Sequence, residues 1–253
     1  MNLISDPIFY LVALPAVTFL GLAKGGFSSV GLLATPLLAL VMPPLQAAAL
    51  LLPILISQDV ISVWWYRRDW DAWNLKVLLP GAALGMGIGW LLAAYVSDAH
   101  VRLLVGTIGV AFVANAWLRG MAEKARKKTA TSGLFWGAIS GFTSFLIQGG
   151  GPPFQVHILP QRLAKMTLVG TTAIFFACVN LMKIVPYFAL GQFTPRNFAT
   201  SLALLPIAAA TNALGIWLVR KTPTELFYRI AYLLVLAVCL ALIWQGAAEL
   251  LRH

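Results

Sequence analysis

Two glycine-rich breaks in apolar segments carry the residues best suited to bind a small anion. The first break is Lys24-Gly25-Gly26-Phe27-Ser28-Ser29, and the second is Gln148-Gly149-Gly150-Gly151-Pro152-Pro153. Glycine lets a backbone approach a ligand closely, because it has no side chain. Where a helix begins, unpaired N–H groups and the positive end of the helix dipole attract negative charge. Two such breaks predict an anion site, provided that a helix follows each of them.

Both breaks carry signals for the start of a new helix. Ser28 and Ser29 are good N-cap residues, because their hydroxyls accept from the first free N–H groups of a helix. Pro152 and Pro153 suit a first helical turn, where the missing N–H has no partner within the helix. We therefore expect a helix after each break.

Charged side chains inside apolar segments are the second signal. Of the 18 Lys and Arg residues, only Lys24 and Lys183 lie well inside such segments, and Asp59 is the only acidic residue there. A charge buried in a membrane costs at least about 2.5 kcal/mol, so each of these residues needs a partner or a function. Asn180 lies three residues before Lys183 and shares its helix face. We expect Asp59 to pair with a lysine or to carry a proton.

The same residues also have purely structural interpretations. Lys24 could extend along a helix end towards the membrane surface, and Lys183 could pair with Asp59. His157 could be a packed histidine, and Asn180 could join two helices by a hydrogen bond. The candidate substrate-binding residues are Lys24, Gly25, Gly26, Ser28, Gln148, Gly149, Gly150, Gly151, Thr171, Asn180 and Lys183. The candidate proton- or ion-coupling residues are Asp59 and His157.

The composition is typical of a protein that crosses a membrane several times. Hydrophobic residues make up 60% of the 253-residue chain and charged residues 10%, against about 25% charged in soluble domains. The net charge of +10 does not indicate nucleic-acid binding, because the basic residues lie in short loops, where positive charge sets membrane topology. Cys178 and Cys239 are isolated and predict neither a disulfide nor a metal site. The first apolar segment has no basic residue before it, which argues against a cleaved signal peptide.

Apolar runs near the roughly 20 residues that cross a bilayer predict an all-α polytopic fold. There are about eight hydrophobic segments, at 7–42, 46–66, 75–95, 101–118, 133–159, 168–190, 198–218 and 226–245. The halves match weakly but in order, with Asp59 opposite Asn180 and Tyr66 opposite Tyr187, as expected of an internal duplication. The expected parts are a first transmembrane repeat at 1–118, a basic cytoplasmic loop at 119–131 and a second repeat at 132–253.

The basic residues discriminate between two arrangements of these repeats. If each broken segment crosses the membrane once, the repeats are parallel; if each returns to its side of entry, they are inverted. The second arrangement brings more basic residues to the cytoplasmic side, which the positive-inside rule favours. The residues that move there are Arg162, Lys165, Arg220, Lys221 and Arg229. We predict two inverted repeats, each a hairpin plus three transmembrane helices, with both termini periplasmic and the hairpin tips meeting near the membrane midplane.

In these motifs the chain resembles the TauE/SafE family of sulfite and organosulfur-anion exporters, over nearly its full length. The most specific feature is Lys-Gly-Gly-Phe at 24–27 followed by Gly-Gly-Pro-Pro at 150–153. Further matching positions are Pro36, Pro53, Asp59, Tyr66, Arg67, Arg68, Leu159, Pro160, Gln161, Arg162, Gly170, Thr171, Asn180 and Lys183. The resemblance implies secondary transport of small anions, such as sulfite, other sulfur compounds or carboxylates. It does not identify the substrate, and Gln148 departs from the small residue of the family pattern.

The function that we predict is secondary transport in the bacterial inner membrane, by an exporter of a small inorganic or organosulfur anion with alternating access. Proton- or sodium-coupled uptake of thiosulfate or a small carboxylate is the alternative within transport. An intramembrane enzyme is disfavoured, because the sequence has no Gly-x-Ser-x-Gly motif and no paired carboxylates. A membrane assembly factor would not need paired breaks with buried lysines. The expected partners are the anion and the lipid bilayer, with no nucleic acid, cofactor or metal; a homodimer is left open.

Overall fold

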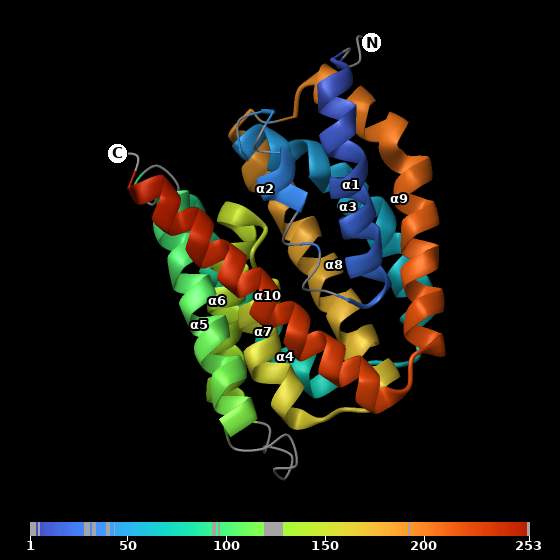
Figure 1. The fold of residues 1–253 in the computed structure, drawn as a ribbon, viewed down its shortest axis with the longest axis vertical. Helices are drawn as coiled ribbons and strands as arrows, with labels where there is room; N and C mark the ends of the chain where they lie inside the picture. Colours follow the sequence, from blue (N-terminus) through green and yellow to red (C-terminus); the bar gives the residue numbers. More distant parts are fainter. Residues whose placement is uncertain are drawn as a thin grey trace. The chain divides into compact units, whose positions relative to one another are not determined.

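The computed structural model describes residues 4, 6–27, 31, 34–38, 41–42, 44–92, 95, 97–118, 129–191 and 193–251. Within these residues the secondary structure is entirely helical (Figure 1). The elements are α1 (Pro7–Gly25), α2 (Ala34–Leu38), α3 (Pro44–Tyr66), α4 (Ala72–Leu92), α5 (Asp98–Leu118), α6 (Ala130–Ile147), α7 (Gly151–Ile158), the 3₁₀ helix η2 (Leu159–Gln161), α8 (Lys165–Ala189), α9 (Pro195–Lys221) and α10 (Thr224–Leu250).

Six of the described helices are long and apolar enough to cross a membrane, namely α1, α3, α4, α8, α9 and α10. This finding confirms the prediction of an all-α multi-pass membrane protein. The remaining predicted segments, 101–118 and 133–159, correspond to α5 and to α6 with α7 and η2. The total of eight segments stays a prediction, and most of the predicted basic loop, residues 119–128, lies outside the described residues.

Left-handed backbone ends the helix before each break. Gly26 follows α1 with φ 143°, and Gln148 follows α6 with φ 56°. Residues with this conformation terminate helices because they turn the chain while its N–H groups bond back to the last carbonyls. Pro152 and Pro153 occupy the first turn of α7, as predicted. The local sequence therefore accounts for where both broken segments stop and where the second one resumes.

After the second break the chain doubles back along the helix that it has just left. At the start of α7, a Cβ added to Gly150 would lie 2.8 Å from the Ser140 carbonyl oxygen of α6. Near the end of α7, His157 Nδ1 lies 3.0 Å from Ser132 Oγ, close to the start of α6. The order of these contacts makes α7 antiparallel to α6, so the two ends of this segment lie near each other.

The first broken segment doubles back in a similar way. A Cβ added to Gly31, after the break, would lie 2.9 Å from the Ala23 side chain and 3.6 Å from that of Leu20. Further on, Ala34 and Leu38 of α2 are fully buried in a hydrophobic cluster with residues of α1, α3 and α9. α2 therefore packs beside α1 and not beyond its end (Figure 1).

The chain forms two compact units that do not coincide with its two halves. One unit combines Met1–Trp70 with Val169–Thr222, and the other combines Asp71–Leu168 with Pro223–His253. Each unit therefore takes helices from both predicted repeats. The repeats themselves concern duplication in the sequence, and their boundaries stay a prediction.

In the first unit, α1 packs along α9 through small residues (Figure 1). A Cβ added to Gly21 would lie 2.0 Å from Thr211 Oγ1, and one added to Gly25 would lie 2.4 Å from the Gly215 backbone. Such approach of two backbones is a common way to pack helices in membranes, where small residues at intervals of four line the interface.

In the second unit, α4 packs along α6 through the same kind of interface. A Cβ added to Gly85 would lie 1.8 Å from the Ala138 carbonyl oxygen, and one added to Gly141 would lie 2.1 Å from that of Ala82. In both units, the first segment of one half packs on the third segment of the other half. In the first unit, the contact between α1 and α9 positions the end of α1, and with it the first break.

Candidate functional site

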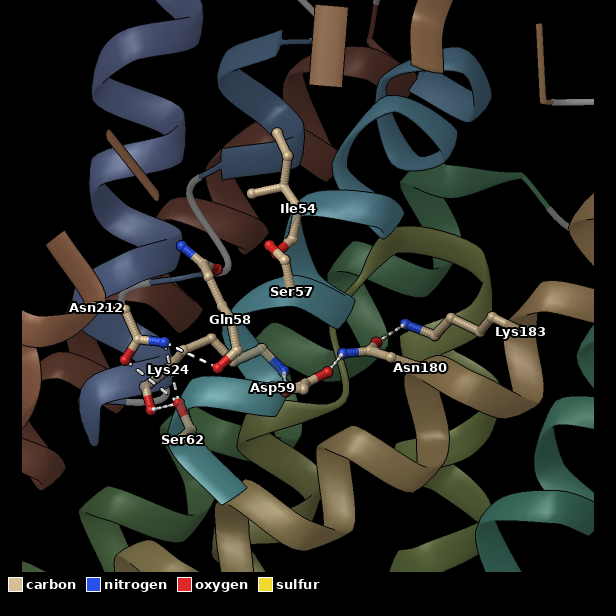
Figure 2. Close-up of polar contacts among 9 residues, drawn as sticks. All are labelled: Lys24, Ile54, Ser57, Gln58, Asp59, Ser62, Asn180, Lys183 and Asn212. Atoms are coloured by element: carbon tan, nitrogen blue, oxygen red, sulfur yellow. Dashed lines mark hydrogen bonds and ion pairs between the residues drawn. The ribbon is translucent and has the colours of Figure 1, made fainter. Parts of the chain in front are cut away.

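A buried ion pair joins the first break to α3. Lys24 Nζ, in the last turn of α1, contacts Asp59 Oδ1 (Figure 2). Only 10% of the lysine side chain and 6% of the aspartate side chain is exposed. The Lys24 ammonium also lies 5.8 Å from the centre of the Phe176 ring, within range of a cation–π contact. Lys24 therefore turns into the protein, and the alternative that it extends along a helix end to the membrane surface is not what the structure shows.

The second oxygen of Asp59 leads to the second buried lysine. Asn180 Nδ2 donates to Asp59 Oδ2 at 2.7 Å, and Lys183 Nζ donates to Asn180 Oδ1 at 3.2 Å. Asn180 and Lys183 share one face of α8, as their spacing predicted (Figure 2). We call Lys24, Asp59, Asn180 and Lys183 the lysine–aspartate cluster.

The lysine–aspartate cluster contains two basic side chains and one acidic side chain. When Lys24, Lys183 and Asp59 are all ionised, its formal net charge is +1. Charges interact far more strongly in a low-dielectric interior than in water. In that fully ionised state, a small anion would neutralise the cluster.

A set of polar residues that the sequence analysis did not single out as a site holds the end of α1 in place. Ser62 Oγ donates to the Lys24 carbonyl at 2.9 Å, and the Tyr66 hydroxyl donates to the Gly25 carbonyl at 2.8 Å. Asn212 of α9 bonds to Ser62 Oγ at 3.1 Å (Figure 2). Carbonyls in the last turn of a helix lack partners within it, and these side chains supply them. The sequence signal that could have identified this set is the presence of a polar residue, such as Asn212, inside an apolar segment.

The cluster does not lie at the middle of α3. Asp59 is seven residues before the end of this helix, which runs Pro44–Tyr66. At a rise of about 1.5 Å per residue, this places Asp59 about 10 Å from the helix end. The first break is therefore level with the final third of α3.

The glycines of the first break have structural roles of their own. Gly25 is where the backbones of α1 and α9 meet, since its added Cβ would overlap Gly215. Gly26 has the positive φ that ends α1. Both positions are explained without a ligand, and their contribution to substrate binding stays a prediction. Ser28 lies outside the described residues.

The second break is tied to α6 by hydroxyl groups. Ser140 Oγ donates to the Gly150 carbonyl at 2.7 Å. Thr143 Oγ1 lies 3.2 Å from the Gly149 carbonyl and 2.8 Å from the Ile139 carbonyl, which share its single hydroxyl proton. Gly149, Gly150 and Gly151 are buried. The backbone N–H of Gly149 bonds to the Thr143 carbonyl at 3.0 Å, so this N–H is already used within the protein.

The other predicted site residues have different surroundings. Thr171 is fully buried in α8, nine residues before Asn180. His157 belongs to the second unit, where Nε2 lies 3.0 Å from Asn74 Oδ1 and Nδ1 lies 3.0 Å from Ser132 Oγ. This pattern fits a neutral imidazole that donates to the amide and accepts from the hydroxyl. It agrees with a packed histidine, and a coupling role for His157 stays a prediction.

A cleft of about 790 Å³ runs between α3 and α8 within the first unit. Its walls are almost entirely apolar and include Val60, Trp64 and Leu181. Asp59 and Cys178 border it. The lysine–aspartate cluster therefore reaches this cleft through Asp59. Apart from Asp59 and Arg67, the side chains of its walls suit lipid or another apolar group.

Six apolar helices among the described residues define a multi-pass membrane protein, and a cluster of buried charges lies between three of them. A family model described as "Sulfite exporter TauE/SafE" matches residues 13–242, which is most of the chain. The chain belongs to this family of membrane transporters. Neither the curated proteins nor the solved structures that were compared with the chain match it.

Proposed function

We propose that this protein is a secondary transporter that exports a small anion such as sulfite or an organosulfonate, and that the anion binds at the lysine–aspartate cluster. Membership of the exporter family supports the reaction. The single observation that supports the site is that two buried lysines are linked to one buried carboxylate, Lys24 directly and Lys183 through Asn180. A binding site with a formal charge of +1 neutralises a monoanion.

Charge also suggests how transport is driven. Export of an anion from a cell with a negative interior is downhill by about 2.3 kcal/mol per charge for each 100 mV, so export needs no coupling ion. Uptake of thiosulfate or a small carboxylate would need one, and Asp59 is the group that we assign to carry it. A proton on Asp59 would raise the formal charge of the cluster to +2, which matches a dianion.

We further propose that the chain consists of two inverted repeats that rock against each other around the site, in the bacterial inner membrane with both termini periplasmic. Two observations support the repeats: the chain doubles back after each break, and α1 and α6 each pack on the third segment of the other half. Transporters built this way bind substrate at broken helices. Backbone groups near Gly25–Gly26 complete the proposed site.

The test is uptake of labelled sulfite into proteoliposomes under an inside-positive potential. The variants are Lys24→Gln and Lys183→Gln, and the control is Lys221→Gln, which removes an exposed charge in the last turn of α9. Loss of one charge-assisted hydrogen bond costs about 1.5–3 kcal/mol, so we expect binding to weaken roughly 10- to 100-fold in the cluster variants and to stay unchanged in the control.

Two outcomes would change the proposal. Saturable sulfite uptake that neither lysine variant affects would show that the anion does not bind at the lysine–aspartate cluster. Absence of sulfite uptake, together with thermal stabilisation of the protein by thiosulfate or a carboxylate, would replace the substrate and keep the transporter, because a ligand stabilises the folded state that binds it.

A further inference from the structure

A charged cavity lies in the second compact unit, which combines Asp71–Leu168 with Pro223–His253, and plays no part in the proposed transport site. Its volume is about 510 Å³. One wall is the segment that follows α7, from Leu159 to Ala164, and the other is the first part of α10. The Tyr228 hydroxyl donates to the Leu163 carbonyl at 2.5 Å and joins the two walls. We call this cavity the arginine pocket.

Two arginines from different elements line the arginine pocket. They are Arg162, directly after η2, and Arg229 on α10, and Glu225 is the acidic residue beside them. Among the described residues, neither arginine forms an ion pair with Glu225 or with another carboxylate. The formal charge of the pocket is therefore +1, and both guanidinium groups are available to a ligand.

The backbone holds Arg162 in an uncommon conformation. Its φ is 49°, in the left-handed region that residues with a Cβ rarely adopt, and its N–H bonds to the Leu159 carbonyl at 3.1 Å. A glycine would adopt this conformation at lower cost. An arginine here directs its side chain along the pocket wall despite that cost, which is consistent with a role for the guanidinium.

The arginine pocket sits where a membrane-spanning helix begins. α10 starts at Thr224 and is apolar enough to cross a membrane. The pocket is lined by three residues from the first turns of α10, namely Thr224, Tyr228 and Tyr232. Tyrosine is enriched at the boundary between lipid and water, because its ring is apolar and its hydroxyl is polar. The pocket thus combines positive charge, phenol groups and apolar walls at one end of a helix that is long enough to cross a membrane.

We propose that the arginine pocket binds the head group of an anionic phospholipid. Guanidinium groups recognise phosphate oxygens by paired, charge-assisted hydrogen bonds. A head group of charge −1 neutralises the pocket, whereas a zwitterionic head group leaves its positive charge uncompensated. Glu225 can accept from hydroxyl groups, as phosphatidylglycerol offers, while Leu159, Leu163 and the Tyr232 ring suit the glycerol and the start of the acyl chains.

The experiment titrates the purified full-length chain in a non-ionic detergent with short-chain dihexanoyl-phosphatidylglycerol, below the concentration at which this lipid forms micelles. Dihexanoyl-phosphatidylcholine is the zwitterionic comparison, and inorganic sulfate is the soluble anion. The variants are Arg162→Gln and Arg229→Gln. Glutamine keeps the backbone cost at position 162, because it also carries a Cβ. Lys221→Gln is the control, since it removes an equal charge three residues before the start of α10.

We expect phosphatidylglycerol to bind at least about tenfold more tightly than phosphatidylcholine, and each arginine variant to weaken this binding about tenfold while the control does not. Equal binding of the two lipids, or binding that both arginine variants retain, would overturn the proposal. Sulfate that binds as tightly as phosphatidylglycerol, with the same dependence on the arginines, would overturn it in favour of a soluble-anion site. Arg162→Lys separates paired recognition from charge: weakened binding supports the guanidinium geometry, and unchanged binding contradicts it.

Discussion

Removing the carboxylate of Asp59 should be more damaging than removing either lysine beside it. Asp59 lies between Lys24, which it contacts directly, and Lys183, which it reaches through Asn180. In Asp59→Asn, two buried ammonium groups remain without the negative charge that offsets them. In Lys24→Gln, Asp59 keeps its hydrogen bond from Asn180 and the field of Lys183.

The size of the effect follows from the burial of the pair. Removal of one partner of a buried ion pair costs about 3–5 kcal/mol, because the other charge stays buried and uncompensated. For a chain of this size, about 1 kcal/mol corresponds to roughly 2–4 °C in the melting temperature. We therefore expect Asp59→Asn to lower the melting temperature by about 6–20 °C. The double variant Asp59→Asn/Lys24→Gln should regain part of that loss, because it removes one of the stranded charges.

A thermal-melting double-mutant cycle of the detergent-solubilised protein measures this coupling. The matched control is Asp69→Asn, an exposed aspartate ten residues further along the chain. The coupling between Asp59 and Lys24 should exceed the range of about 0.3–0.5 kcal/mol within which independent sites add. Strict additivity, or an Asp59→Asn protein that melts like the control, would refute the idea that the two residues form a charged pair in the folded protein.

Three further changes test other parts of the structure. Gly85→Ala should destabilise the protein by about 1–3 kcal/mol or more, because the new Cβ would lie 1.8 Å from a backbone oxygen of α6. Gly87→Ala on the same helix meets open space and should be neutral or stabilising by up to about 1 kcal/mol. Thermal melting compares the two variants directly, and an equal loss of stability would contradict the close packing of α4 on α6. Tyr66→Phe removes the hydrogen bond to the Gly25 carbonyl. This change should lower the free energy of unfolding by about 1 kcal/mol in the same measurement and should lower the rate of anion transport. Unchanged melting and transport would show that this bond does not hold the first break in place. Cysteines introduced at Arg102 and Lys165 should react with an impermeant reagent from outside intact cells at position 102 and not at position 165, and reaction at 165 would exclude the inverted arrangement.

Much of the fold could be predicted from local sequence. The boundaries of α1 and α7 follow from Gly26 and from Pro152 and Pro153, because a left-handed glycine and a first-turn proline act on the backbone next to them. That the chain has several long apolar helices follows from composition and length, although only six of the described helices are long and apolar enough to cross a membrane and the total of about eight segments stays a prediction. The pairing of α1 with α9, and of α4 with α6, could not be predicted, because apolar faces of similar composition do not specify which helix they pack against.

The candidate site shows the same division between local and tertiary information. That Lys24, Lys183 and Asp59 require partners was evident from their apolar surroundings, as was the shared face of Asn180 and Lys183. The structure shows Lys24, and not Lys183, in direct contact with Asp59, with Asn180 between Asp59 and the second lysine. The sequence analysis also attributed the glycine at position 25 to close approach of a ligand, whereas the structure places another helix there.

The sequence by itself determined that this chain is a helical membrane protein, where its first and fifth apolar segments are broken, and which charges are buried, since these properties depend on residue type and near neighbours along the chain. Only the tertiary structure decided which residues the buried charges contact. Asp59 accepts from Lys24 of α1 and from Asn180 of α8 because the fold brings these two side chains, which are far apart in sequence, within reach of α3. The identity of such neighbours depends on how whole helix surfaces fit together, and no local pattern contains that information.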